Sequence, residues 1–313
     1  MPHRTLGGLA RPRSDSPERL TELVEALQRN APTAPGVEAH LHSVITDAAA
    51  HPGRLVRARL VDLAARTHGL AAADAEHLAC AVEFLHLASL LIDDLPCMDD
   101  ATHRRGRPCA HRVHGEASTI LAALAFINRA YALANLSFAR QSSEIRVAAI
   151  ACLDSCLGTA GLVGGQALDL RFAESPGTAR NVSTVALRKT ASLFWLAVLL
   201  PALPATPSAR ELHLLKALCI YWGLAYQAAD DLADLIGAAA TTGKTPGRDR
   251  ALSRPNLAVA LGVPATRHRV ARLSAVANQA ISTLIGSHPR WSYLIAFHEH
   301  VVPSPAGALV NAA

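Results

Sequence analysis

Most of the chain consists of long windows rich in alanine and leucine, in which apolar residues recur at helical spacing. The strict alternation of apolar and polar positions that is typical of half-buried strands is nearly absent. Several windows are apolar on almost every face, which is typical of the central helices of a large bundle. The pattern predicts helices over residues 17–30, 37–50, 54–67, 73–95, 115–139, 144–172, 182–203, 208–237 and 266–286.

Segments rich in glycine and proline separate these windows, and no repeat or linker divides the chain. A single helical core can reach the size of this chain, which has 313 residues, 50% of them hydrophobic. We therefore predict one all-α domain over residues 17–313, preceded by a disordered tail over residues 1–16. The tail lacks the apolar segment of a secretory signal, and an arginine-rich transit peptide is its alternative interpretation.

Composition narrows the classes of function and location. The net charge is only +5 and the basic residues are spread along the chain, so nucleic-acid binding is not expected. The six cysteines lack the CxxC pairing typical of zinc sites, which favours reduced thiols in a cytoplasmic protein. An apolar run of ~20 residues would be needed to span a bilayer, and the best candidate is interrupted by Pro201 and Pro204. We expect no membrane span.

The segment "LLIDDLPCMDD" places four aspartates directly after an otherwise apolar helical window. A polar stripe of Glu83, His86 and Ser89 runs along one face of that helix and ends at Asp93. Because the C-terminal end of a helix is the negative end of its dipole, acids at this point need a compensating cation. A solvated acidic helix end is therefore the weaker interpretation.

The residues that follow extend this set of oxygen ligands. Pro96 prevents further helix and turns the chain, so that Asp99 and Asp100 can fold back toward the first acids. A second cluster lies in "LAYQAADDLADLIG", where Asp230 and Asp234 are one turn apart on an apolar helix. Two carboxylate clusters on apolar helices favour a hard divalent cation, Mg²⁺ above all.

Mg²⁺ in such a site usually also binds a phosphate group of the substrate. Basic residues of this chain could bind the same phosphate. Each of these residues alone is typical of solvated surface, and His86 alone is typical of a buried core histidine. Together with the acidic clusters they predict a cavity for phosphorylated ligands. They lie in glycine- and proline-bearing loops, at a helix start and within an apolar helix: Arg54, Arg57, Arg104, Arg105, Lys189 and Lys244.

In this order the motifs resemble those of the trans-prenyl diphosphate synthases, the family that includes farnesyl and geranylgeranyl diphosphate synthases. "DDLPCMDDATHRRGRP" is similar to the first aspartate-rich motif of the family, and "QAADDLAD" is similar to the second. "GLVGGQALDL", "RKTASLF" and "GKTPGRD" match further blocks, so that the resemblance covers about residues 40–265. It implies the isoprenoid synthase fold, a large helical bundle around a central active-site cavity.

The resemblance also implies a role for each matched position. Three Mg²⁺ ions, with Mn²⁺ as a substitute, would bind the acids of the two motifs: Asp93, Asp94, Asp99, Asp230, Asp231 and Asp234. The allylic diphosphate would be held or surrounded by polar residues of several blocks: Arg104, Lys189, Gln227, Lys244, Gln166, Asp169 and Thr190. Isopentenyl diphosphate would bind Arg54, Arg57, His86 and Arg105. A homodimer is implied as well.

Several positions depart from the family pattern. Arg54 stands in the place of a lysine, and an arginine can still hold phosphate, even with two hydrogen bonds. We therefore expect altered geometry at this end of the site and an unchanged reaction class. The other departures are Leu55, Ala58, Ile92 and Ala229.

In this family the side chains upstream of the first acids set the length of the product. Farnesyl diphosphate synthases typically carry an aromatic residue four or five positions upstream, where this chain has the small residues Ser89 and Ala88. One turn earlier, Phe84 and Leu85 would form the floor of the cavity. We therefore expect elongation of dimethylallyl, geranyl or farnesyl diphosphate to the twenty-carbon geranylgeranyl diphosphate, with farnesyl diphosphate as the second choice.

Two alternatives from outside the chain-elongation enzymes stay open. A class I terpene cyclase also uses an aspartate-rich helix and Mg²⁺, but its second motif usually contains Asn, Ser and Glu. A non-catalytic synthase subunit usually loses acids from one motif. Both aspartate motifs are complete here, which argues against both alternatives.

Overall fold

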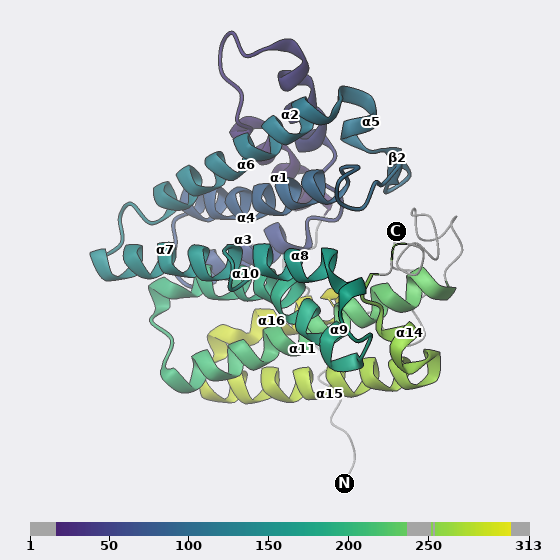
Figure 1. The fold of residues 1–313 in the computed structure, drawn as a ribbon. Helices are drawn as coiled ribbons and strands as arrows, with labels where there is room; N and C mark the ends of the chain where they lie inside the picture. Colours follow the sequence, from purple (N-terminus) through teal and green to yellow (C-terminus); the bar gives the residue numbers. More distant parts are fainter. Residues whose placement is uncertain (1–16, 237–251, 253, 302–313) are drawn as a thin grey trace.

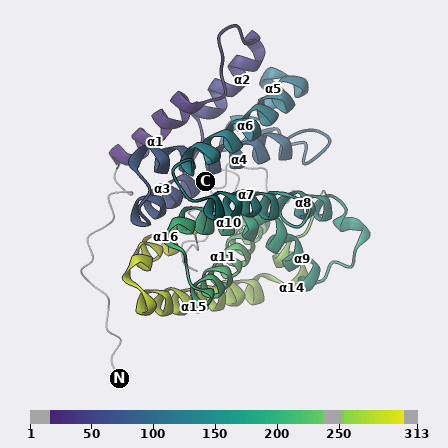
Figure 2. The same ribbon diagram turned by 90° about the vertical axis from the view of Figure 1, so that its left-hand side faces the viewer.

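Helices make up nearly all of the part that the computed structural model describes, residues 17–236, 252 and 254–301 (Figures 1 and 2). The all-α class predicted from the sequence is confirmed, whereas the predicted tail over residues 1–16 lies outside the described residues. The α-helices are α1 (Pro17–Asn30), α2 (Ala39–Ala50), α3 (Val56–Thr67), α4 (Ala72–Asp93), α5 (Ala110–His114), α6 (Glu116–Ser137), α7 (Ser143–Leu157), α8 (Leu162–Leu170), α9 (Ala179–Ala186), α10 (Ser192–Ala202), α11 (Ala209–Ile236), α14 (Leu257–Leu261), α15 (Val263–Ser287) and α16 (Tyr293–Val301). The shorter elements are the strands β1 (His103–Arg104) and β2 (Arg107–Pro108), the π-turn η3 (Leu187–Ala191), and the 3₁₀ turns η2 (Phe172–Glu174), η4 (Leu203–Ala205) and η5 (Pro289–Ser292).

Helix α4 lies inside the bundle, with α3, α6 and α10 packed against it. Its sequence is apolar on nearly all sides, and the ring of Phe84 lies 5.1 Å from that of Phe126 on α6. In both views α2, α5 and α6 lie on one side of the molecule, and α14 and α15 lie on the opposite side (Figures 1 and 2). Packing along its whole length therefore fixes where α4 ends and where its terminal acids lie.

The structure departs from the predicted helices where glycine and proline set the local backbone. The window 144–172 divides into α7 and α8 because the chain turns at Gly158 and Gly161. A Cβ atom there would lie 2.6 Å and 2.0 Å, respectively, from backbone carbonyl oxygens. Pro201 stands in the last turn of α10 and does not interrupt it.

The sequence pattern also fails to predict α5, α14 and α16. The first two have only five residues each, which is too short for helical periodicity to be recognised. The third has nine residues and follows a 3₁₀ turn directly. All three lie at the ends of longer windows, where prediction of boundaries is weakest.

Four helical stretches are long and apolar enough to cross a membrane by length and composition: Ala72–Asp93, Glu116–Ser137, Ser143–Leu170 and Ala179–Ala205. In the first and last, 67% of the apolar window is buried inside the protein, against 39% and 33% in the other two. The last stretch contains Pro201 and Pro204, which were expected to interrupt it. The absence of a membrane span therefore stays a prediction.

Candidate active site

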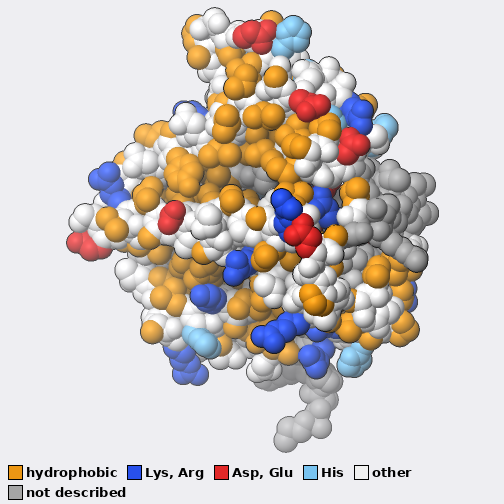
Figure 3. Space-filling model, in the orientation of Figure 1, with side chains coloured by type: hydrophobic (Ala, Val, Ile, Leu, Met, Phe, Trp, Pro, Cys, Tyr) orange, Lys and Arg blue, Asp and Glu red, His pale blue; other side chains and the backbone are white. Residues whose placement is uncertain are grey.

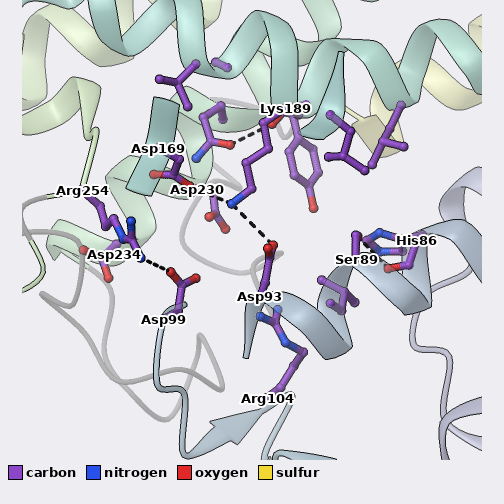
Figure 4. Close-up of a pocket in the computed structure, with 18 of the residues that line it drawn as sticks. His86, Ser89, Asp93, Asp99, Arg104, Asp169, Lys189, Asp230, Asp234 and Arg254 are labelled. Atoms are coloured by element: carbon purple, nitrogen blue, oxygen red, sulfur yellow. Dashed lines mark hydrogen bonds and ion pairs between the residues drawn. The ribbon is translucent and has the colours of Figure 1, made fainter. Parts of the chain in front are cut away.

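A cavity of about 340 Å³ brings together most of the polar residues singled out in the sequence (Figure 4). It opens beside the C-terminal end of α4 and is closed by residues of α9, η3 and α11. Both aspartate-rich segments, far apart in the sequence, contribute to its wall. The acids that line it are Glu83, Asp93, Asp99, Asp169, Asp230 and Asp234, and the basic residues are Arg54, Arg57, Arg104, Arg105, Lys189 and Arg254.

The first aspartate segment forms one wall of the cavity. Asp93 is the last residue of α4, and the chain then folds back so that the backbone N–H of Asp99 donates to the Asp93 carbonyl at 3.0 Å. This fold-back, expected from Pro96, brings Asp99 into the cavity. Asp100 does not follow: it has a left-handed φ of 46° and pairs with Arg112 at 2.9 Å, outside the cavity.

Asp94 is buried and does not line the cavity. Arg104 of β1 donates from Nε to its Oδ2 at 2.8 Å and from Nη2 to its Oδ1 at 2.6 Å. Burial disfavours the charged guanidinium, but the Asp94 carboxylate outweighs this effect and holds the pKa of Arg104 above its ordinary value. Both oxygens of Asp94 are thus bound to Arg104 and hold that residue at the cavity wall, while a role of Asp94 as a metal ligand stays a prediction.

The second aspartate segment lies on α11. Asp230 and Asp234, one turn apart, line the cavity. Asp231 is only 1% exposed and accepts hydrogen bonds from the Leu257 backbone N–H at 2.7 Å and from the Gln227 amide at 2.9 Å. In this structure it faces the core and anchors the start of α14 to α11, while its role as a metal ligand stays a prediction.

Lys189 is the cation that lies between the two acidic segments (Figure 4). Its Nζ lies 2.8 Å from Asp169 Oδ2 and 3.4 Å from Asp93 Oδ2. Burial by itself favours the neutral amine, but these two carboxylates reverse the effect and hold the pKa of Lys189 above its ordinary value. Burial also raises the pKa of Asp93, and the charge of Lys189 opposes that rise. Each member of the pair thus favours the charged form of the other at the cavity wall.

Lys189 and its neighbour Thr190 belong to the π-turn η3, an element that frequently occurs at functional sites. Thr190 Oγ1 donates to Gln227 Oε1 at 3.0 Å, which links η3 to α11. The sequence analysis predicts both residues at the site, but the periodicity of an apolar helix gives no indication of the π-turn.

Two glycines allow neighbouring helices to contact the backbone of η3. A Cβ atom on Gly165 of α8 would lie 2.5 Å from the backbone nitrogen of Lys189. A Cβ atom on Gly223 of α11 would lie 2.5 Å from the Cβ of Ala191. Contacts this short force the backbone to move, so the absence of side chains at both positions fixes the location of η3.

The other end of the cavity is basic. Arg57 Nη1 lies 3.4 Å from His86 Nε2, and the Arg57 guanidinium carbon lies 5.2 Å from the ring centroid of Phe194. Burial lowers the pKa of His86 well below its ordinary value, so the ring is neutral. Because arginine can only donate, Nε2 accepts and the ring proton lies on Nδ1. Arg105 Nη1 donates to the Pro52 carbonyl at 2.6 Å.

Three of the positions that depart from the family pattern are buried: Leu55 is 2% exposed, Ala58 is 1% exposed and Ala229 is 6% exposed. Leu55 has a left-handed φ of 52° and directly precedes α3, while Arg54 beside it lines the cavity. Ile92 packs against the core. Apolar residues at these positions are thus consistent with their surroundings.

The residues predicted to form the floor are buried by the packing of α4, and their role in product length stays a prediction. Ser89 lines the cavity, whereas Phe84, Leu85 and Ala88 are buried in the core and do not. Phe84 lies against α6, on a different side of α4 from the cavity. The apolar part of the wall comes mainly from other elements: Leu90, Leu162, Val182, Val185, Ala186 and Leu193.

Two predicted residues cannot be assigned to the cavity. Gln166 of α8 is absent from its wall, and its amide nitrogen and oxygen are buried with no hydrogen-bond partner in the part of the chain that is described. Lys244 lies outside the described residues.

Arg254 is a functional candidate that the sequence reasoning misses. Its Nη2 donates to Asp99 Oδ1 at 2.9 Å and to the Met98 carbonyl at 2.8 Å, and its side chain is 10% exposed (Figure 4). One feature of the sequence could have indicated its role: Arg254 follows the predicted site residue Lys244 by ten positions, after the same glycine-containing segment. Glu83 is the second such residue: the polar stripe on α4 contains it, but spacing alone assigns it no role.

The acids fit a hard divalent cation without forming a ready-made cage. Among the described residues, no three acidic, histidine or cysteine side chains are grouped closely enough to hold a metal ion. Asp93 and Asp99 on one wall, and Asp230 and Asp234 on the other, offer only oxygen ligands. Mg²⁺ is typically bound by one or two carboxylates together with waters and substrate phosphates. These residues therefore suit Mg²⁺ that binds together with a diphosphate.

Comparison with known proteins agrees with this site. The family model described as Polyprenyl synthetase matches residues 38–283. The chain is similar to a farnesyl diphosphate synthase of Bacillus subtilis (31% identity over 70% of this chain and 74% of that protein). It is also similar to a geranylgeranyl diphosphate synthase of Pantoea ananas (34% identity over 77% of this chain and 78% of that protein).

A solved structure shares the fold. It is a geranyltransferase from Helicobacter pylori complexed with magnesium and isoprenyl diphosphate, with a TM-score of 0.80 and 22% identity over 92% of this chain and 98% of that one. The fold is therefore the all-α isoprenoid synthase bundle. The family match spans both aspartate segments and the π-turn between them. The chain belongs to the polyprenyl synthetase family.

Proposed function

We propose that the protein is a short-chain prenyltransferase that condenses isopentenyl diphosphate with an allylic diphosphate. The observation that carries this proposal is a single cavity with two different ends. Aspartates from α4 and α11, together with Lys189, suit a metal-bound diphosphate at one end. Arg57, Arg105 and His86 suit a diphosphate without metal at the other. Two anion-binding ends favour two diphosphate substrates.

Residues of this chain can supply the fixed positive charge and the apolar surroundings that this reaction needs. When bound, Mg²⁺ ions (three are expected, with Mn²⁺ as a substitute) neutralise the charge that develops on the leaving diphosphate. Lys189 and Arg104 add fixed positive charge that does not reorganise as the carbon–oxygen bond breaks. The double bond of isopentenyl diphosphate attacks the allylic cation, and a proton then leaves to the released pyrophosphate. Apolar side chains such as Val185 and Leu193 exclude water from the cation.

Geranylgeranyl diphosphate is the product that we propose. It is supported by the small side chain of Ser89 on the cavity wall and by the similarity to geranylgeranyl diphosphate synthases. Farnesyl diphosphate is the alternative, because farnesyl diphosphate synthases match equally well. The test is an assay of purified protein with labelled isopentenyl diphosphate and dimethylallyl, geranyl or farnesyl diphosphate, with products separated by chain length.

The same assay tests the whole proposal. Condensation that requires both substrates and Mg²⁺ is the expected result. Hydrocarbon formed from geranylgeranyl diphosphate alone would instead show a terpene cyclase. Protein that is inactive alone and active only with a partner synthase would show a non-catalytic subunit.

We also propose that the protein is a cytoplasmic homodimer. Large apolar side chains are exposed on α6 and α7, among them Leu121, Leu124, Val147 and Ile150, and hydrophobic side chains gather on this face (Figure 3). A second copy covering this face would bury them. All six cysteines are free, which supports a reducing compartment. Sedimentation of the purified protein tests the oligomeric state.

A further inference from the structure

Glu83 is a buried acid at the basic end of the cavity. Its side chain is 1% exposed, and it lies on α4 one turn before His86. The backbone N–H of Ala58 on α3 donates to its carboxylate, whereas its Oε2 is buried and has no hydrogen-bond partner in the described part of the chain. A negative charge here opposes the binding of an anion, so its presence needs a separate physical reason.

Two arginines from different segments line the same cavity as Glu83 and act on its carboxylate through their charge, Arg57 from α3 and Arg105 from the turn after β1. Burial raises the pKa of Glu83 to about 7, and the charges of Arg57 and Arg105 limit that rise. Two guanidinium groups that line one cavity repel each other, and a carboxylate in the same wall offsets part of that repulsion.

Both arginines also contact residues other than Glu83. The guanidinium of Arg105 packs against Gly53, where a Cβ atom would lie 2.1 Å from Nη1, and Nη1 also donates to the Pro52 carbonyl. Arg57 lies between His86 and the face of Phe194. Each arginine is thus restrained by packing and by the electrostatic attraction of Glu83.

The polar atoms in this cluster are not all satisfied by protein groups. Arg57 Nε, His86 Nδ1 and Glu83 Oε2 are buried and have no hydrogen-bond partner among the described residues. Arg57 Nε and His86 Nδ1 are donors that a bound diphosphate can satisfy, whereas Glu83 Oε2 is an acceptor that needs a donor such as water.

We propose that Glu83 is a positioning residue for isopentenyl diphosphate, which holds Arg57 and Arg105 in the orientation that receives the diphosphate. This inference rests on the proposed function and adds a residue to it. An acid near two arginines lowers the attraction for an anion at long range, but its charge restrains the donors before the substrate arrives. Binding then costs less ordering of the two long side chains.

The test is Glu83→Gln, which keeps the shape and removes the charge. Isothermal titration calorimetry with isopentenyl diphosphate alone measures the affinity, and steady-state kinetics measures KM for each substrate. We expect Kd and KM for isopentenyl diphosphate to rise about tenfold, the effect of about 1.4 kcal/mol. KM for the allylic diphosphate and kcat should stay within about twofold. Glu76→Gln is the matched control, because Glu76 lies on the same helix, far from the cavity wall, and pairs with Arg29.

A fall in Kd for isopentenyl diphosphate, in place of the expected rise, would overturn the proposal. If the carboxylate only repels the substrate, Glu83→Gln lowers Kd for isopentenyl diphosphate, and unchanged values would show no role at all. A rise in both KM values with a fall in Tm would indicate a structural role instead.

A second variant keeps the proposal testable if Glu83→Gln does not fold. Glu83→Asp retains the charge but shortens the side chain, and we expect Kd for isopentenyl diphosphate to stay within about threefold of wild type; a tenfold rise would contradict a role of the charge. An effect of Glu83→Gln that persists in full in an Arg57→Ala, Arg105→Ala background would contradict action through these arginines. If the wild-type protein neither binds isopentenyl diphosphate nor condenses it, the proposed function fails before Glu83 is tested.

Discussion

Asp93 and Asp94 are neighbours in the sequence, and the structure assigns them different tasks. Asp93 faces the cavity beside Lys189, whereas Asp94 binds Arg104 through two hydrogen bonds. Exchanging each of them for asparagine therefore separates metal binding from the support of an arginine. The expected results differ both in stability and in the response to Mg²⁺.

Asp94→Asn removes one partner of a buried ion pair. The exposed fractions of the two side chains are 7% for Asp94 and 24% for Arg104, so little water can replace the lost carboxylate. Breaking such a pair typically costs 3–5 kcal/mol, and the asparagine oxygen retains part of the contact, so we expect a loss of about 3 kcal/mol in the free energy of unfolding. Arg104 loses its orientation, and KM for the allylic diphosphate rises.

The assays are urea unfolding and a titration of activity with Mg²⁺. For Asp94→Asn we expect the half-saturating Mg²⁺ concentration to stay within about twofold of wild type, since no ligand is lost. For Asp93→Asn it should rise strongly, and kcat should fall by orders of magnitude. Asp100→Asn is the control, because Asp100 is exposed and lies outside the cavity.

One result would refute this reasoning. If Asp94→Asn raises the Mg²⁺ requirement as much as Asp93→Asn does, while the free energy of unfolding is unchanged, then Asp94 acts as a metal ligand and the ion pair with Arg104 has little structural importance.

Three further predictions follow from other residues. Arg254→Met removes the cation that binds Asp99, so KM for the allylic diphosphate should rise; equal KM and kcat values in variant and wild type would exclude Arg254 from the site. Ser89→Phe narrows the cavity and should shorten the main product, as judged by chromatography of the extracted prenols; an unchanged product distribution would contradict a role of this wall in chain length. Burial, followed by the charge of Arg290, lowers the pKa of His68 to about 4, so the folded state disfavours its protonation. Because the pKa in the unfolded chain is about 6.5, this contribution to stability is present above pH 6.5 and is lost as the pH falls toward 4. Wild type should lose about 2 kcal/mol more than His68→Gln between pH 7 and pH 4.5 in urea unfolding, and identical losses would contradict the assignment.

The sequence predicts the long helices well because their periodicity extends over many residues. It also identifies both acidic segments, since acids beside apolar windows demand a cation. It cannot decide which of two adjacent acids faces the cavity. That choice depends on Arg104, which reaches Asp94 from a turn after the helix, and on Leu257, whose backbone N–H binds Asp231.

Residues whose role depends on tertiary contacts are likewise beyond the sequence pattern. Arg254 is brought to Asp99 from a distant part of the chain, and Gln227 contacts Thr190 across two helices. The positions of Phe84 and Leu85, which the sequence predicts to form a floor, depend on tertiary contacts in the same way. Which side of an all-apolar helix faces a cavity is set by its neighbours, here by Phe126 on α6.

The two glycines beside η3 determine how this enzyme can be altered. Because Gly165 and Gly223 contact the backbone of η3, the position of the Lys189 amine depends on main-chain packing as well as on its ion pairs with Asp93 and Asp169. Apolar wall residues that contact neither glycine, such as Val182, can therefore be exchanged for longer or shorter substrates while these restraints on Lys189 remain. A single methyl group added at either glycine would displace η3, and Lys189 with it, without changing the identity of any residue that lines the cavity.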